Sequence, residues 1–183
     1  VLFLPISIDR AMRRMPWATL SLVALNILAY MGLLGIWGRS PEAQVAAFRQ
    51  FGFVPGQAHW YALLSALFLH AGAMHLFSNM LFLWLFGSLV EDVLGPGLFL
   101  LLYLGGHLGA TAAHAAIANL LQTGAQLQPM VGASGAVAAV LGLSVMRFYR
   151  TKVRIWYWFL IRSGVVGVAA WVFVGLFMGY QVL

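Results

Sequence analysis

Ser134 lies in the Gly-Ala-Ser-Gly sequence Gly132–Gly135, where small residues surround a hydroxyl that could act as a nucleophile. The motif follows Pro129 and opens a short apolar run over residues 134–146, so Ser134 is expected at the turn into a helix. A serine hydroxyl attacks a carbonyl group only when an adjacent base takes its proton. A serine in this position can equally cap the free amides of the helix, and the small residues can serve close packing. The motif therefore allows acyl-transfer chemistry without requiring it.

His75 and Asn79 form a second polar feature, in an otherwise apolar run over residues 74–90. They are four residues apart, so they share one face of a helix. Both side chains donate hydrogen bonds, and a donor aimed at the oxyanion of acyl transfer typically contributes about 3–4 kcal/mol. Contact with a neighbouring helix is the alternative explanation. Near Ser134, the two side chains and the serine's own amide would form an oxyanion hole.

Five apolar runs must position these groups: residues 17–37, 74–90, 98–121, 134–146 and 163–183. Backbone groups in hydrocarbon must be paired within their own segment, so we predict an all-α, polytopic transmembrane helical bundle. The fourth run is short for a complete span. It is expected to begin inside the bilayer and to line a water-filled pocket. The pairs Gly105/Gly109 and Gly175/Gly179 predict close helix packing.

The composition agrees with a membrane protein of one domain over residues 1–183. Hydrophobic residues make up 63% of the chain and charged residues only 8%. Soluble domains have about 25% charged residues, so most of this surface must face lipid. The chain has no cysteine, which excludes disulfides and thiolate metal sites. We expect no metal and no cofactor.

The positions of the basic residues indicate the orientation of the bundle. Arg10, Arg13 and Arg14 precede the first run, and five basic residues lie between the fourth run and the fifth. Both clusters fall on the same side of the membrane, so the positive-inside rule places the N-terminus in the cytoplasm. The net charge of +6 then serves topology and contact with anionic lipids, and no nucleic-acid partner is expected. Glu91 and Asp92 follow the second run, where contacts with a helix end or a loop are expected. The predicted location is a bacterial cytoplasmic membrane.

Together these residues resemble the rhomboid family of intramembrane serine proteases. The second-span pattern is His70…His75…Asn79, and the nucleophile pattern is Gly132-Ala-Ser134-Gly135. The entry to the first span, the Glu91–Gly95 turn and the basic loop after the fourth span are similar as well. The resemblance implies six spans and a serine–histidine dyad. Ser134 would be the nucleophile, and His75, Asn79 and the Ser134 amide would form the oxyanion hole.

The resemblance also implies supporting residues and substrates. His70, Gly132 and Gly135 would line or support the cavity. Transmembrane proteins would be cut near the outer membrane face, and the fifth span would be the mobile gate. One departure concerns the general base, because the family carries its catalytic histidine on a sixth span, which is not in this sequence. We therefore expect a chain truncated at both ends, inactive as the isolated fragment.

No other histidine is assigned as the base. His107 and His114 lie seven residues apart in the third run, where a buried contact between helices is the simpler expectation. His59 is expected in the solvated outer loop. The leading hypothesis is an intramembrane endopeptidase, and the alternative is a non-catalytic rhomboid-like protein that binds membrane clients. A small-solute transporter is disfavoured because no pair of interrupted segments repeats in two halves.

Overall fold

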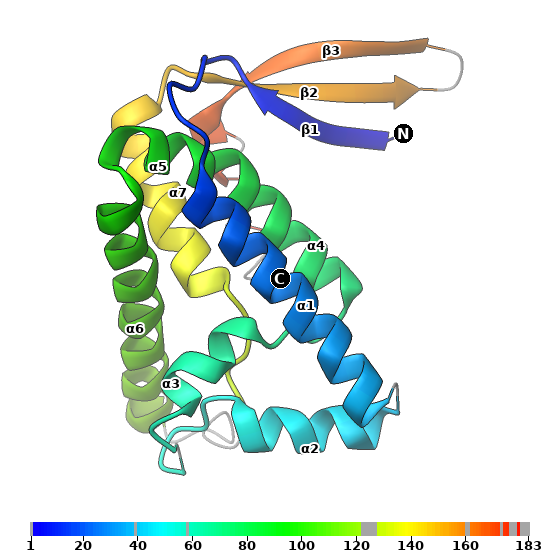
Figure 1. Ribbon diagram of the computed structural model, residues 1–183, viewed down its shortest axis with the longest axis vertical. Coiled ribbons are helices and arrows are strands. Elements are labelled where there is room, and N and C mark those ends of the chain that lie inside the picture. The colour runs from blue at the N-terminus through cyan, green and yellow to red at the C-terminus, as the bar shows by residue number, and fades with distance from the viewer. Residues whose placement is uncertain are drawn as a thin grey trace.

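A computed structural model describes most of the chain: residues 2–38, 40–57, 59–121, 128–159, 162–172, 174–175 and 179. It combines a helical bundle with a small sheet at one end (Figure 1). The helices are α1 (Trp17–Trp37), α2 (Pro41–Phe51), α3 (Ala62–Ser65), α4 (Ala73–Phe82), α5 (Ser88–Leu94), α6 (Pro96–Leu121) and α7 (Ser134–Phe148). The strands are β1 (Leu2–Ile8), β2 (Lys152–Phe159) and β3 (Arg162–Ala169).

Three helical stretches among the described residues are long and apolar enough to cross a membrane, namely Trp17–Ile36, Ala73–Leu94 and Pro96–Leu120. The second joins α4 to α5 through a π-helical segment, Leu83–Gly87. The fourth apolar helix, α7, has only 15 residues. The predicted helical membrane bundle is confirmed, and the first four apolar runs are helical close to their predicted bounds.

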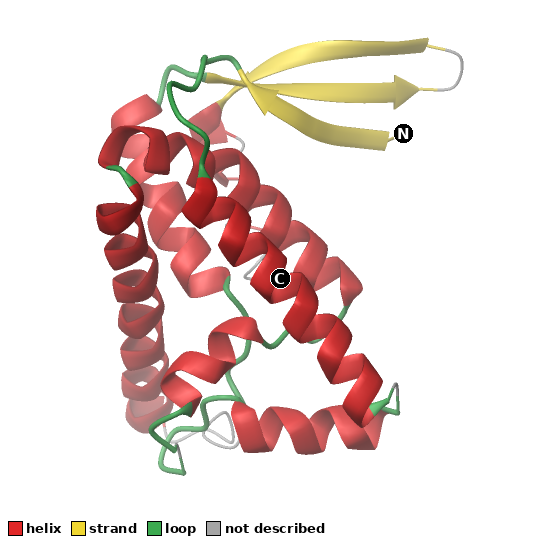
Figure 2. Cartoon of the chain, viewed as in Figure 1, coloured by secondary structure: helices red, strands yellow, loops and turns green. Residues whose placement is uncertain are grey.

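The core of the bundle forms around α7. Val137, Val140 and Leu141 have no exposed surface, and they belong to one apolar cluster with Phe86 and Phe99 from the neighbouring helices. Figure 2 shows α1 and α6 running along most of the bundle, α4 and α7 in the part nearer the sheet, and α2 and α3 at the end opposite the sheet. The start of α7 lies partway along the bundle, as a short span that begins within it should.

Small residues set the contact between α6 and α7, but in a different register from the predicted one. A side chain at Gly106 would collide with Ala139, and one at Gly135 would collide with Ala110. At Gly105 and Gly109, in contrast, a Cβ would meet no described atom within 4 Å. The same holds at Gly175 and Gly179, so the packing predicted for both pairs is not observed among the described residues. The contact uses the neighbouring face of α6.

The sheet corrects the prediction for the fifth run. Residues 163–169 are strand instead of helix, and β2 pairs antiparallel with both β1 and β3. The local sequence explains this result, because exposed Lys152 and Arg154 alternate with buried Val153 and Ile155, the period of a half-buried strand. Helix begins at residue 170 and includes 171–172, 174–175 and 179; the rest of the predicted span lies outside the described residues.

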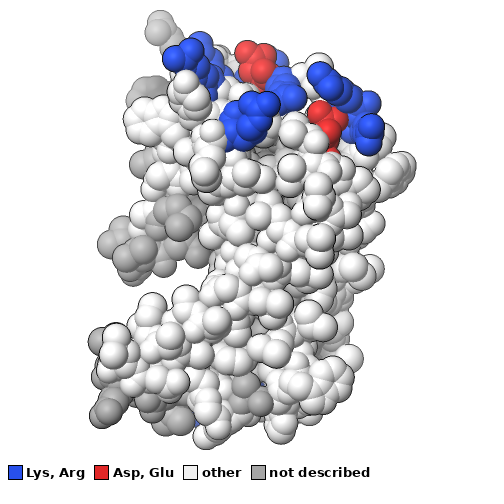
Figure 3. Space-filling model, turned by 90° about the vertical axis from the view of Figure 1, so that its left-hand side faces the viewer, with Lys and Arg blue, Asp and Glu red and all other residues white. Residues whose placement is uncertain are grey.

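Basic residues gather at the sheet end of the molecule (Figure 3). They come from the segment before α1, from the end of α7 and from β2: Arg10, Arg13, Arg14, Arg147, Arg150, Lys152 and Arg154. Arg49 lies on α2, at the other end. The prediction that the two basic clusters share one end of the bundle is therefore confirmed.

The carboxylate of Glu91 binds the start of α1. Its Oε1 accepts a hydrogen bond from the Ala18 amide at 2.9 Å, and its Oε2 accepts from the Thr19 amide and hydroxyl, each at 2.7 Å. Asp92 Oδ1 accepts from the amides of Arg13 and Arg14. The helix-end and loop contacts predicted for these two acids are thus observed.

Candidate active site

The loop before Ser134 is fixed by backbone hydrogen bonds to the segments between α2 and α4. Met130 and Phe53 exchange two hydrogen bonds, of 3.0 and 2.8 Å. The amide of Gly132 donates to the carbonyl of Ala66 at 2.8 Å. Two segments distant in sequence therefore determine where α7 begins.

Gly132 brings this loop against the imidazole of His75. Its φ of +113° lies in the region that side chains disfavour. A Cβ placed there would lie 2.8 Å from Cε1 and 3.0 Å from Nε2 of His75. Glycine is therefore required for two independent reasons, its backbone conformation and the closeness of the ring.

Ser134 is the first residue of α7, and Ala133 occupies the N-cap position. No side chain caps this helix, so the capping explanation for Ser134 does not apply. The serine is half-buried, and its hydroxyl has no hydrogen-bond partner among the described residues. The first backbone amides of a helix have no hydrogen-bond partner within the helix, so these N–H groups are available as donors beside the Ser134 hydroxyl.

His75 presents a donor toward the loop. Its Nδ1 accepts a hydrogen bond from the Ala71 amide at 3.4 Å, so the neutral ring carries its proton on Nε2. That nitrogen is the one that lies near Gly132. Asn79 is completely buried and donates through Nδ2 to the carbonyl of His75 at 3.0 Å, which leaves one N–H of its amide available.

His70 packs beside His75, with ring centroids 5.2 Å apart and an interplanar angle of 66°. Nδ1 of His70 lies 3.4 Å from the carbonyl oxygen of Phe68, and its buried Nε2 has no hydrogen-bond partner among the described residues. Burial, followed by the neighbouring His75, lowers the pKa of His70 to about 4, against the opposing effect of the Phe68 carbonyl. His70 is therefore neutral at pH 7, and its ring lies against that of His75.

A model of the rhomboid domain matches residues 57–182, which is most of the chain. The chain belongs to the rhomboid family. It is 36% identical over 129 residues to the rhomboid protease GluP of Bacillus subtilis (strain 168), covering 69% of this chain and 24% of GluP. It is 31% identical over 130 residues to the putative rhomboid protease YdcA of the same organism, covering 66% of this chain and 60% of YdcA.

A plant relative extends the comparison. The chain is 34% identical over 113 residues to the chloroplastic rhomboid-like protein 11 of Arabidopsis thaliana, covering 62% of this chain and 38% of that protein. The chain thus spans less than two thirds of the length of each of these three relatives. Two of them are named as proteases, which is consistent with serine protease chemistry in this family.

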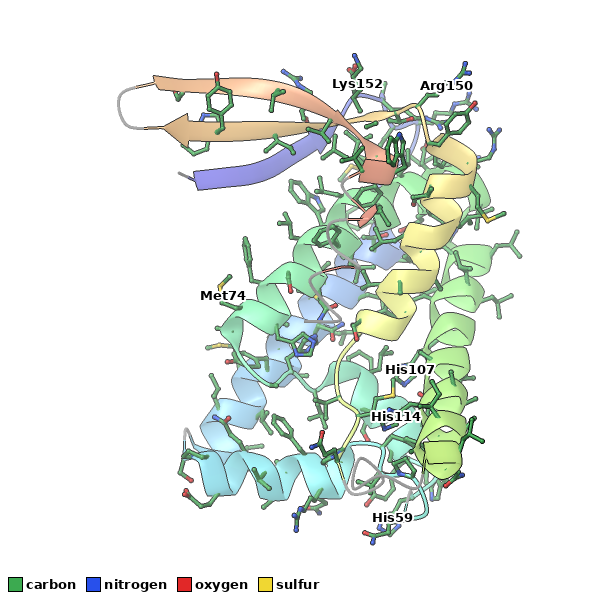
Figure 4. The ribbon with its side chains drawn as sticks, turned by 180° about the vertical axis from the view of Figure 1, so that it is seen from behind. His59, Met74, His107, His114, Arg150 and Lys152 are labelled. Carbon is green, nitrogen blue, oxygen red and sulfur yellow. The ribbon has the colours of Figure 1, made fainter. Side chains whose placement is uncertain are left out.

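The other three histidines lie on α6 and in the loop before α3. His107 is buried on α6, and its Nε2 lies 2.8 Å from the carbonyl oxygen of Leu63. This bond is the contact between helices that the sequence predicted for it. The buried Nε2 of His114, further along the same helix, has no hydrogen-bond partner among the described residues, so the contact predicted for His114 is not observed there. His59 stacks on Tyr61 at the end opposite Arg150 and Lys152 (Figure 4). No hydrogen bond joins any of the described histidines to Ser134.

The predicted site residues divide into two groups. His70, His75, Asn79 and Gly132 lie together at the start of α4, with Ser134 two residues beyond the Gly132 contact. Gly135 instead faces Ala110 of α6, so its support is indirect: it lets α6 approach α7. Sequence reasoning missed the Ala66 carbonyl and the Phe53–Met130 pairing, because backbone contacts leave no mark on residue type.

Gly132→Ala is expected to destabilise this rhomboid by about 2–3 kcal/mol, because it combines a disfavoured φ with a collision against His75. The measurement is the midpoint of thermal unfolding in detergent. Gly142→Ala is the matched control, since it lies on exposed α7 surface with no described atom within 4 Å of the added Cβ. That control should be neutral or stabilising by up to about 1 kcal/mol. Equal midpoints for the two variants would contradict the Gly132–His75 geometry.

Proposed function

We propose that this rhomboid is an intramembrane serine endopeptidase in which Ser134 is the nucleophile. The observation that carries the proposal is the contact of Gly132 with the His75 ring, which brings the serine loop to a hydrogen-bond donor. A free hydroxyl at a helix start, beside a neutral imidazole donor, suits attack on a carbonyl and binding of the resulting oxyanion. The names of GluP and YdcA support the same chemistry.

The proposed reaction begins when Ser134 Oγ attacks the carbonyl carbon of the scissile peptide. The hydroxyl proton passes to a general base, which then returns it to the leaving amine. The oxygen that gains charge is held by His75 Nε2–H, by the remaining N–H of Asn79 and by the amide of Ser134. Water then hydrolyses the acyl-enzyme. The family resemblance places the base histidine on a further span.

The proposed substrates are transmembrane proteins, cut near the outer face of the membrane. The basic end of the bundle would face the cytoplasm by the positive-inside rule. Ser134 opens α7 at the end away from that basic surface, and α7 is too short to cross the bilayer. A peptide bond reaching Ser134 would therefore enter from the outer half of the bilayer.

Binding of membrane clients without cleavage is the second candidate function. It is favoured by one observation: the Ser134 hydroxyl has no hydrogen bond to any described histidine. A protein of this kind would keep the cavity and hold a client helix intact.

A cleavage assay with a transmembrane reporter tests the choice between these functions. The protein, expressed from its full reading frame, is expected to cleave a reporter whose transmembrane helix contains helix-breaking residues. His75→Ala should lower kcat by about 10²- to 10³-fold, because one oxyanion donor is lost. His59→Ala, a histidine stacked on Tyr61 outside the site, is the control and should retain full activity. Capture of the reporter without cleavage by the unaltered protein would favour client binding.

A further inference from the structure

A cavity of about 220 Å³ lies between the segment that joins β1 to α1 and the middle of the second spanning helix. Arg10 and Met12 line it from the joining segment, and Trp84, Leu85, Ser88 and Leu89 line it from the helix. One water molecule occupies about 30 Å³ of the liquid, so the space exceeds what a single water needs. The cavity is at the sheet end of the bundle, because Ser7 and Ile8 of β1 and the segment that follows also line it.

Two polar groups of this cavity lack a hydrogen-bond or ion-pair partner among the described residues. Ser88 is 3% exposed, and its buried Oγ has no hydrogen-bond partner in that part of the chain. A buried hydroxyl without a partner is costly and points to a ligand atom. The guanidinium of Arg10 has no carboxylate of the described residues within 4.0 Å. It rests instead on the ring of Phe148, with its Cζ 4.7 Å from the centroid.

A second cation adds to the positive charge at this place. The Cζ of Arg147 lies 5.7 Å from the centroid of the same Phe148 ring. The carboxylates of Glu91 and Asp92 accept hydrogen bonds from amides at and before the start of α1, and neither forms an ion pair with the two arginines among the described residues. Arg10, which lines the cavity, can therefore bind a phosphate group there, and Arg147 adds positive charge nearby.

Apart from Ser7, the remaining residues that line the cavity are apolar. Trp84 is 44% exposed and Met12 is 51% exposed, whereas Leu85 and Leu89 are buried. Contact with apolar walls would not stabilise a free phosphate ion, but an acyl chain would be stabilised there because its apolar surface is removed from water. The ligand that fits a cation, a buried hydroxyl and an apolar flank together is an anionic phospholipid.

We propose that this cavity binds one anionic phospholipid from the leaflet at the basic end of the bundle. Arg10 holds the phosphate with help from Arg147, Ser88 Oγ donates to an ester or glycerol oxygen, and an acyl chain lies along Trp84. Because residues 9–16 join the sheet to α1, the bound lipid fastens this segment and the sheet to the spanning helix. The site is separate from the proposed catalytic groups.

Fluorescence quenching by brominated lipids tests this proposal. The purified chain is reconstituted into vesicles of phosphatidylcholine, with or without phosphatidylglycerol, with bromine on the acyl chains of one lipid at a time. Brominated phosphatidylglycerol should quench the protein more strongly than brominated phosphatidylcholine, and Trp84→Phe should remove that difference. Arg10→Gln should weaken the preference for phosphatidylglycerol by about fivefold, the effect of one basic residue near an anionic surface.

The control variant is Arg49→Gln, which removes the same charge from α2 at the other end of the molecule. It should leave the preference intact. Ser88→Ala should lower the preference while the variant still unfolds at a normal temperature, because a buried hydroxyl without a protein partner is lost. Equal quenching by the two lipids, or equal losses in Arg10→Gln and Arg49→Gln, would overturn the proposal. Soluble glycerophosphoglycerol should not compete, and competition by it would indicate a simple phosphate site.

Discussion

Replacing Ser134 by alanine is expected to lower cleavage of a transmembrane reporter by about 10⁴-fold or more, because the nucleophile is removed. The Ser134 hydroxyl makes no hydrogen bond with any described residue, so its loss should cost little stability. The free energy of unfolding should therefore stay within about 0.5 kcal/mol of that of the unaltered protein. The assay uses membranes that contain the protein expressed from its full reading frame.

Ser144→Ala is the matched control on the same helix. Ser144 is fully buried on α7, and its hydroxyl donates to the carbonyl of Val140 at 2.8 Å. Its removal should cost about 1 kcal/mol of stability and leave cleavage unchanged. Comparison of the two variants therefore distinguishes a loss of catalysis from a loss of stability. Cleavage that persists in Ser134→Ala would exclude Ser134 as the nucleophile, whatever the stability of the variant.

The sequence is informative about the site because polar side chains within apolar runs are costly in lipid, so each of them indicates a specific contact or function. Ser134, His75 and Asn79 each fall at the same end of an apolar run, so the helical topology alone predicts that they approach one another. The structure brings the serine loop to His75 as expected. The detail that makes the approach possible, a positive φ at Gly132, depends on the Ala66 carbonyl, and any residue type provides a carbonyl.

The register of the α6–α7 contact was ambiguous in the sequence. Residues 105 and 109 are both glycine, and residues 106 and 110 are glycine and alanine, so two small-residue pairs overlap on adjacent faces. Either face allows close approach, and the position of α7 decides between them. The structure uses Gly106 and Ala110. A pattern in one helix cannot predict which face its partner will meet.

The sheet was missed because overall apolarity concealed a two-residue period. Residues 163–169 are apolar enough to count toward a span, but their three valines favour strand and their two glycines disfavour helix. The alternation of Lys152, Val153, Arg154 and Ile155 was the available signal. The basic residues of this stretch instead predict a loop, because the strands that pair with it, β1 and β3, cannot be recognised from the local pattern.

Glu91→Gln is expected to destabilise the bundle by about 3 kcal/mol, the largest stability effect among the substitutions considered. Of the first amides of α1, those of Ala18 and Thr19 bind Glu91, whereas the amide of Leu20 bonds to the Pro16 carbonyl. The Glu91 side chain is 4% exposed, so water cannot replace it easily. Glutamine would turn one acceptor oxygen into a donor that faces other donors, and it would remove the charge that favours a helix N-terminus.

Two other acids, Asp92 and Glu42, provide graded controls for Glu91→Gln. Asp92→Asn keeps an oxygen that can accept from the exposed amides of Arg13 and Arg14, so it should cost less than about 1 kcal/mol. Glu42→Gln, in the exposed first turn of α2, should change stability by no more than about 0.5 kcal/mol. Thermal unfolding in detergent would measure all three. If Glu91→Gln and Glu42→Gln had the same midpoint, Glu91 would not anchor α1 to α5, because its three hydrogen bonds could then be lost without cost.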